Sequence, residues 1–277
     1  MRIHSISTGH VQVRESQVHS RGTGGRRRLN VLRDPHWTQP LPIHAWAIEH
    51  PEGLVLVDTG EVHEASDPRY YPAANPYLRR ATRFQVDPGD VIDEQLRRLG
   101  LAADQVRWVV LTHLHADHAG GLRFFPQAEI VLAEAEYAAA RGVPGRLRGY
   151  TPQHWPDWLA PRTTRFPAGP VGQFAASHAL TAAGDVLLVP TPGHTHGHLS
   201  VLVHRPDQPT LLLAGDASYT QQLMLDGVVD GVAVDERAAH DTLRRLQRHT
   251  RSEPTVYLPA HDPGSAERYR LEQVVPS

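Results

Sequence analysis

The stretch LTHLHADHAGG, residues 111–121, holds three histidines and an aspartate within six consecutive positions, namely His113, His115, Asp117 and His118. They follow RWVVLT, an apolar run that predicts a buried strand. Side chains on the loop that leaves such a strand can converge on one point. Neutral imidazole and carboxylate are ligands for Zn, Fe, Mn and Co. The stretch therefore predicts a metal site, and the alternative is a chance cluster of surface residues.

A metal ion needs donors beyond one loop, and three later strand-like runs end in further donors. VPTPGHTHGH, LLLAGDASY and YLPAHDPG all pass from apolar to polar residues, so a sheet edge would present their donors to a shared cleft. The candidates at these ends are His194, His196, His198, Asp216, His261 and Asp262. Asp262 is expected to be a turn residue.

Composition narrows the chemistry further. The 277 residues contain no cysteine and 19 histidines, which excludes thiolate ligands and cysteine nucleophiles. The formal charge of -2 gives no overall basic character, so nucleic acid is not an expected partner. The run Arg26, Arg27 and Arg28 is interpreted as a solvated loop, with a binding role as the alternative. No signal peptide and no stretch of roughly 20 apolar residues is evident, so we expect a cytoplasmic protein without membrane contact.

The order of strand-like and helical runs predicts an α/β fold. Several neighbouring strands have no helix between them, which favours an αββα sandwich of two mixed sheets flanked by helices over one doubly wound parallel sheet. One helix is expected in DVIDEQLRRLG, with Asp90 as N-cap and Gly100 at its end. We predict a single domain over residues 1–277, with insertion loops near 15–40, 61–89 and 143–170.

The second and third of these loops are rich in aromatic residues and are candidates for a substrate pocket. Long loops inside a compact domain are commonly functional. Local packing of the same side chains is the alternative. The aromatic residues are Tyr70, Tyr71, Tyr77, Phe84, Trp155 and Trp158, and Trp37 and Trp46 near the first strands have the same ambiguity.

The pattern His-x-His-x-Asp-His, followed by a later His, Asp and His, resembles that of the metallo-β-lactamase-fold hydrolases. The resemblance extends from VDTG at Asp58 to His261. It implies two divalent metal ions, with zinc favoured and Fe, Co or Mn as alternatives. The ligand sets that it implies are His113, His115 and His194 for one ion, Asp117, His118 and His261 for the other, and Asp216 as a bridge between them.

Within that superfamily the motifs HLHADHAGG, PGHTHGHLS and DASY are most similar to those of the N-acyl homoserine lactonases. This resemblance implies opening of a lactone ring and a homodimer. It implies that Tyr219 is a hydrogen-bond donor to substrate and that Asp117 relays a proton. Tyr70 and Trp155 are predicted to contact substrate with Tyr219. The alternatives are hydrolysis of another lactone, a thioester or a phosphotriester, a nucleic-acid phosphodiesterase, and a non-catalytic binding protein.

Two further residues are expected to support the metal ligands. His198 lies close to His194 in the sequence and is expected beside the site, orienting it through hydrogen bonds. His196 is given less weight as a ligand because the family pattern uses the first histidine of that run. Asp58 in VDTG is expected to steady a ligand or its loop, with a turn-forming role as the alternative.

Overall fold

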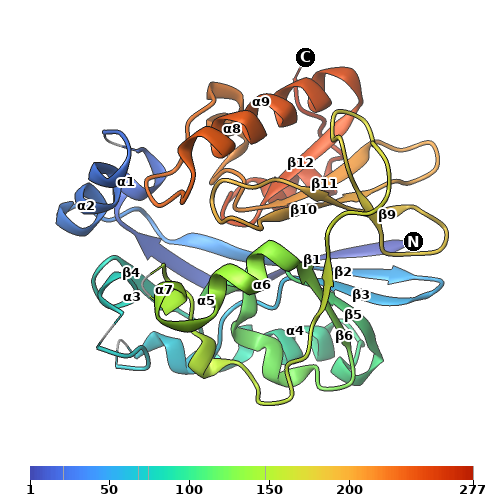
Figure 1. Cartoon of the computed structure of the whole chain (residues 1–277). Helices are drawn as coiled ribbons and strands as arrows, with labels where there is room; N and C mark the ends of the chain where they lie inside the picture. Colours follow the sequence, from blue (N-terminus) through green and yellow to red (C-terminus); the bar gives the residue numbers. More distant parts are fainter. Residues whose placement is uncertain (21, 68, 74, 147, 277) are drawn as a thin grey trace.

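The computed structural model describes residues 1–20, 22–67, 69–73, 75–146 and 148–276. Over these residues the chain forms two mixed β-sheets that face each other, with helices on both outer sides (Figure 1). This confirms the predicted αββα sandwich. The first sheet is built from the earlier part of the chain, and the second from the later part, which runs from yellow to red in Figure 1.

The first sheet, over the described residues, has the strand order β4-β1-β2-β3-β5-β6-β7. Neighbours from β4 to β3 are antiparallel, and neighbours from β3 to β7 are parallel. The parallel part brings the carboxyl ends of β3 and β5 to the same edge. The strands are β1 (Arg2–Val13), β2 (Leu41–His50), β3 (Gly53–Val57), β4 (Thr82–Gln85), β5 (Val106–Val110), β6 (Glu129–Ala133) and β7 (Arg162–Thr164).

The second sheet has the order β12-β11-β10-β9-β8. Only β11 and β12 are parallel, and the other described neighbours are antiparallel. The strands are β8 (His178–Ala179), β9 (Val186–Pro190), β10 (Leu199–Val203), β11 (Thr210–Gly215) and β12 (Thr255–Pro259).

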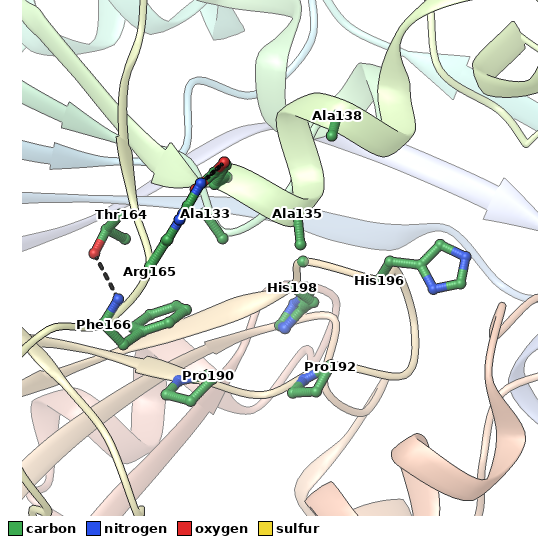
Figure 2. A pocket seen from close by; sticks show the side chains of 12 residues that line it. Ala133, Ala135, Ala138, Thr164, Arg165, Phe166, Pro190, Pro192, His196 and His198 are labelled. Carbon is green, nitrogen blue, oxygen red and sulfur yellow. Dashed lines mark hydrogen bonds and ion pairs between the residues drawn. The ribbon is translucent and has the colours of Figure 1, made fainter.

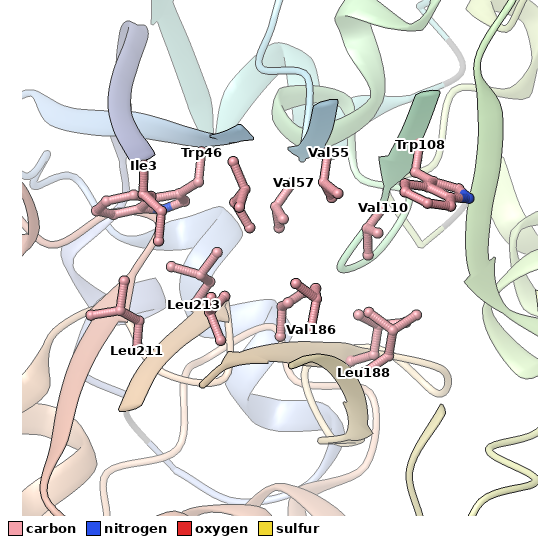
Figure 3. Close-up of a cluster of buried hydrophobic side chains, with 14 of the residues drawn as sticks. Ile3, Trp46, Val55, Val57, Trp108, Val110, Val186, Leu188, Leu211 and Leu213 are labelled. Carbon is pink, nitrogen blue, oxygen red and sulfur yellow. The ribbon is translucent and has the colours of Figure 1, made fainter. Parts of the chain in front are cut away.

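A layer of apolar side chains joins the two sheets (Figure 3). Val55 and Val57 of β3 and Val110 of β5 face Val186 of β9 and Leu213 of β11 across this layer. Successive side chains of a strand point to opposite faces, so each strand contributes alternate residues. Burial of such a side chain contributes about 1.5–3 kcal/mol, so the layer holds the strand ends of both sheets in a fixed relation.

Helices cover the outer faces, with α8 and α9 on the second sheet and α4 on the first. Ala239, Leu243 and Leu246 lie on the buried side of α9, at the spacing of an amphipathic helix. In the described part of the chain, no helix has both the length and the apolar character needed to cross a bilayer. The α-helices are α1 (Glu15–Val18), α2 (Gly25–Arg33), α3 (Pro76–Arg80), α4 (Ile92–Arg98), α5 (Ala116–Ala119), α6 (Glu134–Ala140), α7 (Gly142–Arg146), α8 (Gln221–Asp226), α9 (Glu236–Ser252) and α10 (Ser265–Arg270). The 3-10 helices are η1 (His63–Ser66), η2 (Pro88–Asp90), η3 (Ala103–Gln105), η4 (Gly120–Phe124) and η5 (Pro152–His154).

The prediction that Asp90 caps α4 is wrong. Val91 is the N-cap residue of α4, and Asp90 ends the preceding 3-10 helix η2. The Asp90 carboxylate accepts a hydrogen bond from the backbone N–H of Asp87 instead. A local capping box therefore uses the side chain that the sequence pattern assigned to the helix. Gly100, with a φ of 76°, does follow the end of α4.

The interpretation of the arginine run as a solvated loop holds only in part. Arg26 and Arg28 are exposed, but the run lies in the helix α2 and Arg27 is buried. The guanidinium of Arg27 donates to the carbonyl oxygens of Asp230 and Ala233. Arg27 therefore fastens the N-terminal segment to a loop of the C-terminal half.

The three predicted insertion loops contain short regular elements. Residues 15–40 include α1 and α2, residues 61–89 include η1, α3 and β4, and residues 143–170 include α7, η5 and β7. Among them, β4 and β7 are the edge strands of the first sheet, and the short helices α1, α2, α3 and α7 lie beside the sandwich (Figure 1).

Candidate metal centre

The seven predicted metal-binding residues all follow strand ends and lie together. His113 and His115 are on the loop after β5, and the short helix α5 carries Asp117 and His118. His194 follows β9, and Asp216 and His261 directly follow β11 and β12. Their donor atoms form three overlapping groups, each compact enough for one ion: His113, His115 and His194; His113, His118 and Asp216; Asp117, His118 and His261.

The first group consists of three imidazoles. His115 Nδ1 lies 3.0 Å from His113 Nε2 and 3.1 Å from His194 Nε2. Three ring nitrogens at such short separations are suited to a single ion of the size of zinc.

Asp216 lies between this group and the second one, with one carboxylate oxygen toward each. Its Oδ2 is 3.4 Å from His194 Nε2 and 3.9 Å from His113 Nε2. Its Oδ1 is 3.2 Å from His118 Nε2 and 3.4 Å from His261 Nε2. This division of the two oxygens is the arrangement that a bridging carboxylate requires.

Asp117 completes the second group. Its Oδ2 is 3.4 Å from His261 Nε2, and its Oδ1 is 4.0 Å from His118 Nε2. The Asp117 side chain is more exposed than that of Asp216, at 15% against 5%. Among the ligand candidates, Asp117 is therefore a carboxylate that a bound substrate can reach.

Hydrogen bonds on the far side of the rings aim the Nε2 lone pairs at the centre. His118 Nδ1 lies 2.8 Å from Asp58 Oδ2, His194 Nδ1 lies 3.1 Å from Asp230 Oδ2, and His261 Nδ1 lies 2.9 Å from Pro42 O. A carboxylate or carbonyl oxygen only accepts, so each Nδ1 carries the proton. The Nε2 atoms are left free to bind metal, as in metal sites whose histidines are oriented by outer partners.

Two buried polar atoms that face each other also fit a metal. His118 Nε2 and Asp216 Oδ1 lie 3.2 Å apart, and neither has another hydrogen-bond partner within the described structure. Burial, together with the neighbouring imidazoles, lowers the pKa of His113 and His115 well below the usual value. Both rings are thus kept neutral, which is the form that binds metal. The donor set fits two divalent cations.

Asp58 and His198 support the ligands as expected. Asp58, at a φ of 60°, accepts from the backbone N–H of Thr112 at 2.8 Å as well as from His118. It therefore orients a ligand and holds the start of the ligand loop, as expected, from a left-handed backbone position just after β3. His198 Nε2 accepts from the backbone N–H of Asp216 at 3.0 Å.

Two supporting carboxylates, Asp230 and Glu136, escaped prediction from the sequence. Glu136 is fully buried, and its two oxygens accept from the backbone N–H groups of Leu114 and Gly197 at 3.0 and 3.1 Å. It thereby links the loop of His113 to the loop of His194. Burial raises the pKa of Glu136. In the sequence Glu136 resembles an ordinary acidic residue in the first turn of a helix, so no local signal distinguishes it.

A narrow cavity opens onto the metal-binding residues. Tyr219 lies in its wall, and its ring stacks on His261 with 5.4 Å between centroids. The wall also contains Tyr77 and Phe84 from the second predicted loop, and Gln17 from α1. Other lining residues are Val11, Val13, Leu78, Thr82, His115, Asp117, Gly149, His194, Asp216 and His261.

Tyr70 and Trp155 do not belong to the described wall of this cavity. Tyr70 packs on His154, and Trp155 stacks on Tyr137. Their assignment to substrate binding remains a prediction, and their observed neighbours match the alternative of local packing.

A wider cavity of about 410 Å³ lies behind the loop that carries His194 (Figure 2). Phe166, Pro190 and Pro192 give it an apolar floor, and an exposed ion pair between Arg165 and Glu134 lies at its side. His196 lines this cavity, away from the metal-binding groups. None of the seven predicted metal-binding residues is part of its described lining.

Asp262 is more than a turn residue. Besides accepting from the backbone N–H of Gly264, it accepts from the backbone N–H of Gln221 and from the Arg268 guanidinium, at 2.8 and 2.6 Å. It therefore holds the start of α8 against the loop that carries His261.

Comparison with known proteins gives the family. A family model for the metallo-β-lactamase superfamily matches residues 38–261. An N-acyl homoserine lactonase of Bacillus cereus is 27% identical over 271 residues, which cover 94% of this chain and 93% of that protein. A probable metallo-hydrolase of Mycobacterium tuberculosis is 32% identical over 248 residues, which cover 80% of this chain and 75% of that protein.

Solved structures agree on the fold. An N-acyl homoserine lactone hydrolase, solved with N-hexanoyl-L-homoserine at its catalytic metal centre, aligns with a TM-score of 0.76 at 24% identity. The alignment covers 99% of this chain and 97% of that one. The span matched by the family model contains all seven metal-binding candidates. The chain therefore belongs to the metallo-β-lactamase superfamily and is a metal-dependent hydrolase.

Proposed function

We propose that this protein is a dinuclear lactonase that opens the ring of N-acyl homoserine lactones. The observation that carries the proposal is the position of Asp216, whose two oxygens face two separate groups of imidazole and carboxylate donors. Similarity to N-acyl homoserine lactonases over more than nine-tenths of both chains supports the substrate class. We propose zinc as the metal, with Fe, Co or Mn as alternatives.

His113, His115 and His194 would hold one cation, Asp117, His118 and His261 the other, and Asp216 would bridge them. Cations held there would supply Lewis-acid activation of the lactone carbonyl and of the attacking water. In the net reaction, water adds hydroxyl to the carbonyl carbon, the ring C–O bond breaks, and a proton goes to the released alkoxide. The product is the ring-opened N-acyl homoserine.

Tyr219 is suited to donate a hydrogen bond to a substrate oxygen. Its hydroxyl oxygen accepts from Gln17 Nε2 at 2.6 Å, which leaves the hydroxyl proton free for another acceptor. Burial raises the pKa of Tyr219 well above the usual value, so the hydroxyl stays protonated. A donor fixed in this way stabilises charge that develops on the carbonyl or leaving oxygen.

Asp117 is the proposed proton relay to the leaving alkoxide. It lines the cavity, and its Oδ2 faces His261. A carboxylate within reach of both the substrate and the ligand shell can take a proton from water and return it to the alkoxide.

The test is a hydrolysis panel on protein of measured metal content. Acyl homoserine lactones of several chain lengths, a simple γ-lactone, a glutathione thioester and a phosphotriester serve as substrates. We expect about two divalent ions per chain and the highest kcat/KM on the acyl homoserine lactones. Metal-replete protein that hydrolyses only the thioester or the phosphotriester would contradict the proposed substrate.

The runner-up is a hydrolase with another substrate on the same centre. The 32% identity to a mycobacterial protein known only as a probable metallo-hydrolase favours it. The same panel separates the two functions. The predicted homodimer and cytoplasmic location stay predictions.

A further inference from the structure

Gln17 is a buried polar residue in the wall of the metal cavity. It comes from α1, near the start of the chain, and its side chain has a relative exposure of 3%. Its Nε2 donates to the Tyr219 hydroxyl at 2.6 Å. Its Oε1 is buried and has no hydrogen-bond partner within the described structure.

The backbone of Gln17 is held in place by the rest of the fold. Its carbonyl oxygen accepts from the backbone N–H of Gly231 at 2.7 Å, and its N–H donates to Arg14 O at 2.8 Å. A Cβ at residue 231 would lie 2.2 Å from Ser16 O, so a glycine is needed for this close approach. The buried guanidinium of Arg27 fastens the same loop through Asp230 O. These contacts fix the backbone of Gln17 beside the cavity, and the hydrogen bond from Nε2 to the Tyr219 hydroxyl fixes its side chain.

An amide oxygen buried without a donor is unfavourable unless a ligand supplies one. The other uncharged polar side chains of the described wall are already engaged. Thr82 donates its hydroxyl to Leu78 O at 2.6 Å, and the Tyr77 hydroxyl interacts with Gln17 itself. Among the uncharged side chains of the described wall, Gln17 Oε1 is thus the acceptor left for a ligand N–H, while the carboxylates of Asp117 and Asp216 belong to the metal-binding groups.

We propose that Gln17 Oε1 accepts a hydrogen bond from the amide N–H of the substrate and so selects N-acylated lactones over lactones without an amide. This inference rests on the proposed lactonase function and names the residue that recognises the acylamino group.

The covalent structure of an N-acyl homoserine lactone fits the pair Gln17 and Tyr219. The amide nitrogen is attached to the ring carbon next to the lactone carbonyl, so the N–H and the carbonyl oxygen are close neighbours. The Gln17 amide and the Tyr219 hydroxyl are neighbours as well, at 2.6 Å. When the lactone carbonyl of the substrate lies beside Tyr219 and the metal-binding residues, the amide N–H of the substrate lies at the same end of the cavity as Gln17.

The first experiment compares Gln17→Met with wild type on two substrates. Methionine keeps the length of the side chain and removes both polar atoms. One substrate is N-hexanoyl homoserine lactone, and the other is an α-alkyl-γ-butyrolactone of equal length, which has no N–H. We expect kcat/KM to fall roughly tenfold more on the first substrate than on the second, the size of one uncharged hydrogen bond.

Two controls separate recognition from general damage. Gln247→Met removes a similar amide, which donates to Met224 O and Leu225 O and lies outside the cavity wall. This variant should leave the ratio of the two kcat/KM values unchanged. In a Tyr219→Phe background, Gln17→Met should still lower the ratio, because the amide contact does not pass through Tyr219. An equal loss on both substrates, or a ratio that no longer changes in that background, would mean that Gln17 only positions Tyr219.

A second measurement needs no variant. Wild-type protein should hydrolyse N-hexanoyl homoserine lactone roughly tenfold better than its N-methyl derivative, which lacks the N–H. Equal kcat/KM values on the two would overturn the role of Gln17 and leave the lactonase function intact. No hydrolysis of any lactone by metal-replete protein would overturn the proposed function itself, and the role of Gln17 with it.

Discussion

The metal-binding cluster and the wall of the cavity above it are built in different ways. In the cluster, His118, His194 and His261 are each oriented by a hydrogen bond from Nδ1 to a buried acceptor. In the wall, apolar side chains such as Val11, Leu78 and Phe84 alternate with polar ones, and Gln17 and Tyr219 make one polar contact across 202 positions of the sequence.

This difference separates what the two regions do. A histidine whose Nδ1 is fixed by a hydrogen bond keeps its Nε2 in one position. The catalytic centre shared by a whole superfamily requires such a fixed geometry. A wall of side chains from separate short segments can change residue by residue without disturbing the ligands. We therefore expect substitutions in the cluster to act on metal binding and turnover, and substitutions in the wall to act on substrate preference.

The largest expected effect is that of Asp216→Ala, which removes a carboxylate facing both ligand groups. Loss of several kcal/mol of charge stabilisation corresponds to a fall in kcat/KM of at least about a thousandfold. Metal content, measured by elemental analysis, should fall below about two ions per chain. Asp226→Ala removes an exposed carboxylate on α8 and is the matched control. It should keep the wild-type kcat/KM and metal content. Full metal content and full turnover in Asp216→Ala would refute the bridging role.

Asp230→Asn should weaken metal binding while leaving the ligands themselves in place. The change removes the charge that faces His194 Nδ1 at 3.1 Å. Loss of such an outer partner typically costs about 10- to 100-fold in metal affinity or activity. Competition with a chelator measures the affinity, and Asp226→Asn is the control. An unchanged affinity would show that the cluster does not depend on its outer hydrogen bonds.

Tyr219→Phe tests the boundary between the two regions, since Tyr219 stacks on a ligand and lines the cavity. The ring is kept and only the hydroxyl is lost, so metal content should be unchanged. Because the metal ions share the stabilisation of charge, we expect a loss in kcat of roughly tenfold to a hundredfold. Tyr257→Phe is the control, because the Tyr257 hydroxyl bonds to Ser218 outside the cavity. A raised KM with normal kcat would make Tyr219 a binding residue only.

The smallest effect is expected in the wall. Phe84 separates the metal cavity from a neighbouring cavity of about 280 Å³, and it lines both. Phe84→Ala should favour longer acyl chains, within the ~1–3 kcal/mol per methylene that apolar walls discriminate. Trp155→Ala and Tyr70→Ala, measured on the same series of chain lengths, test the two residues predicted from the sequence. If these two shift the preference and Phe84→Ala does not, the acyl group lies outside the cavity described here.

The sequence and the structure agree where the signal was local. The seven residues predicted from LTHLHADHAGG and from the runs after β9, β11 and β12 lie together, because a strand end fixes where the next few residues go. The prediction failed at Asp90, where a local alternative for the carboxylate was available. It also failed at Arg27, whose acceptors are carbonyls more than 200 positions away.

The sequence by itself determined the sandwich and the grouping of the candidate metal ligands, because periodic apolar runs and the spacing of histidines and aspartates act over a few residues. Only the tertiary structure decided which side chains meet across the fold. Glu136 between two ligand loops, Asp230 behind His194, and Gln17 beside Tyr219 have no local pattern that marks them. Each depends on two segments that the packing of the sheets brings together. A buried polar group is recognisable as functional only once its partners, or the absence of a partner in the described structure, are known.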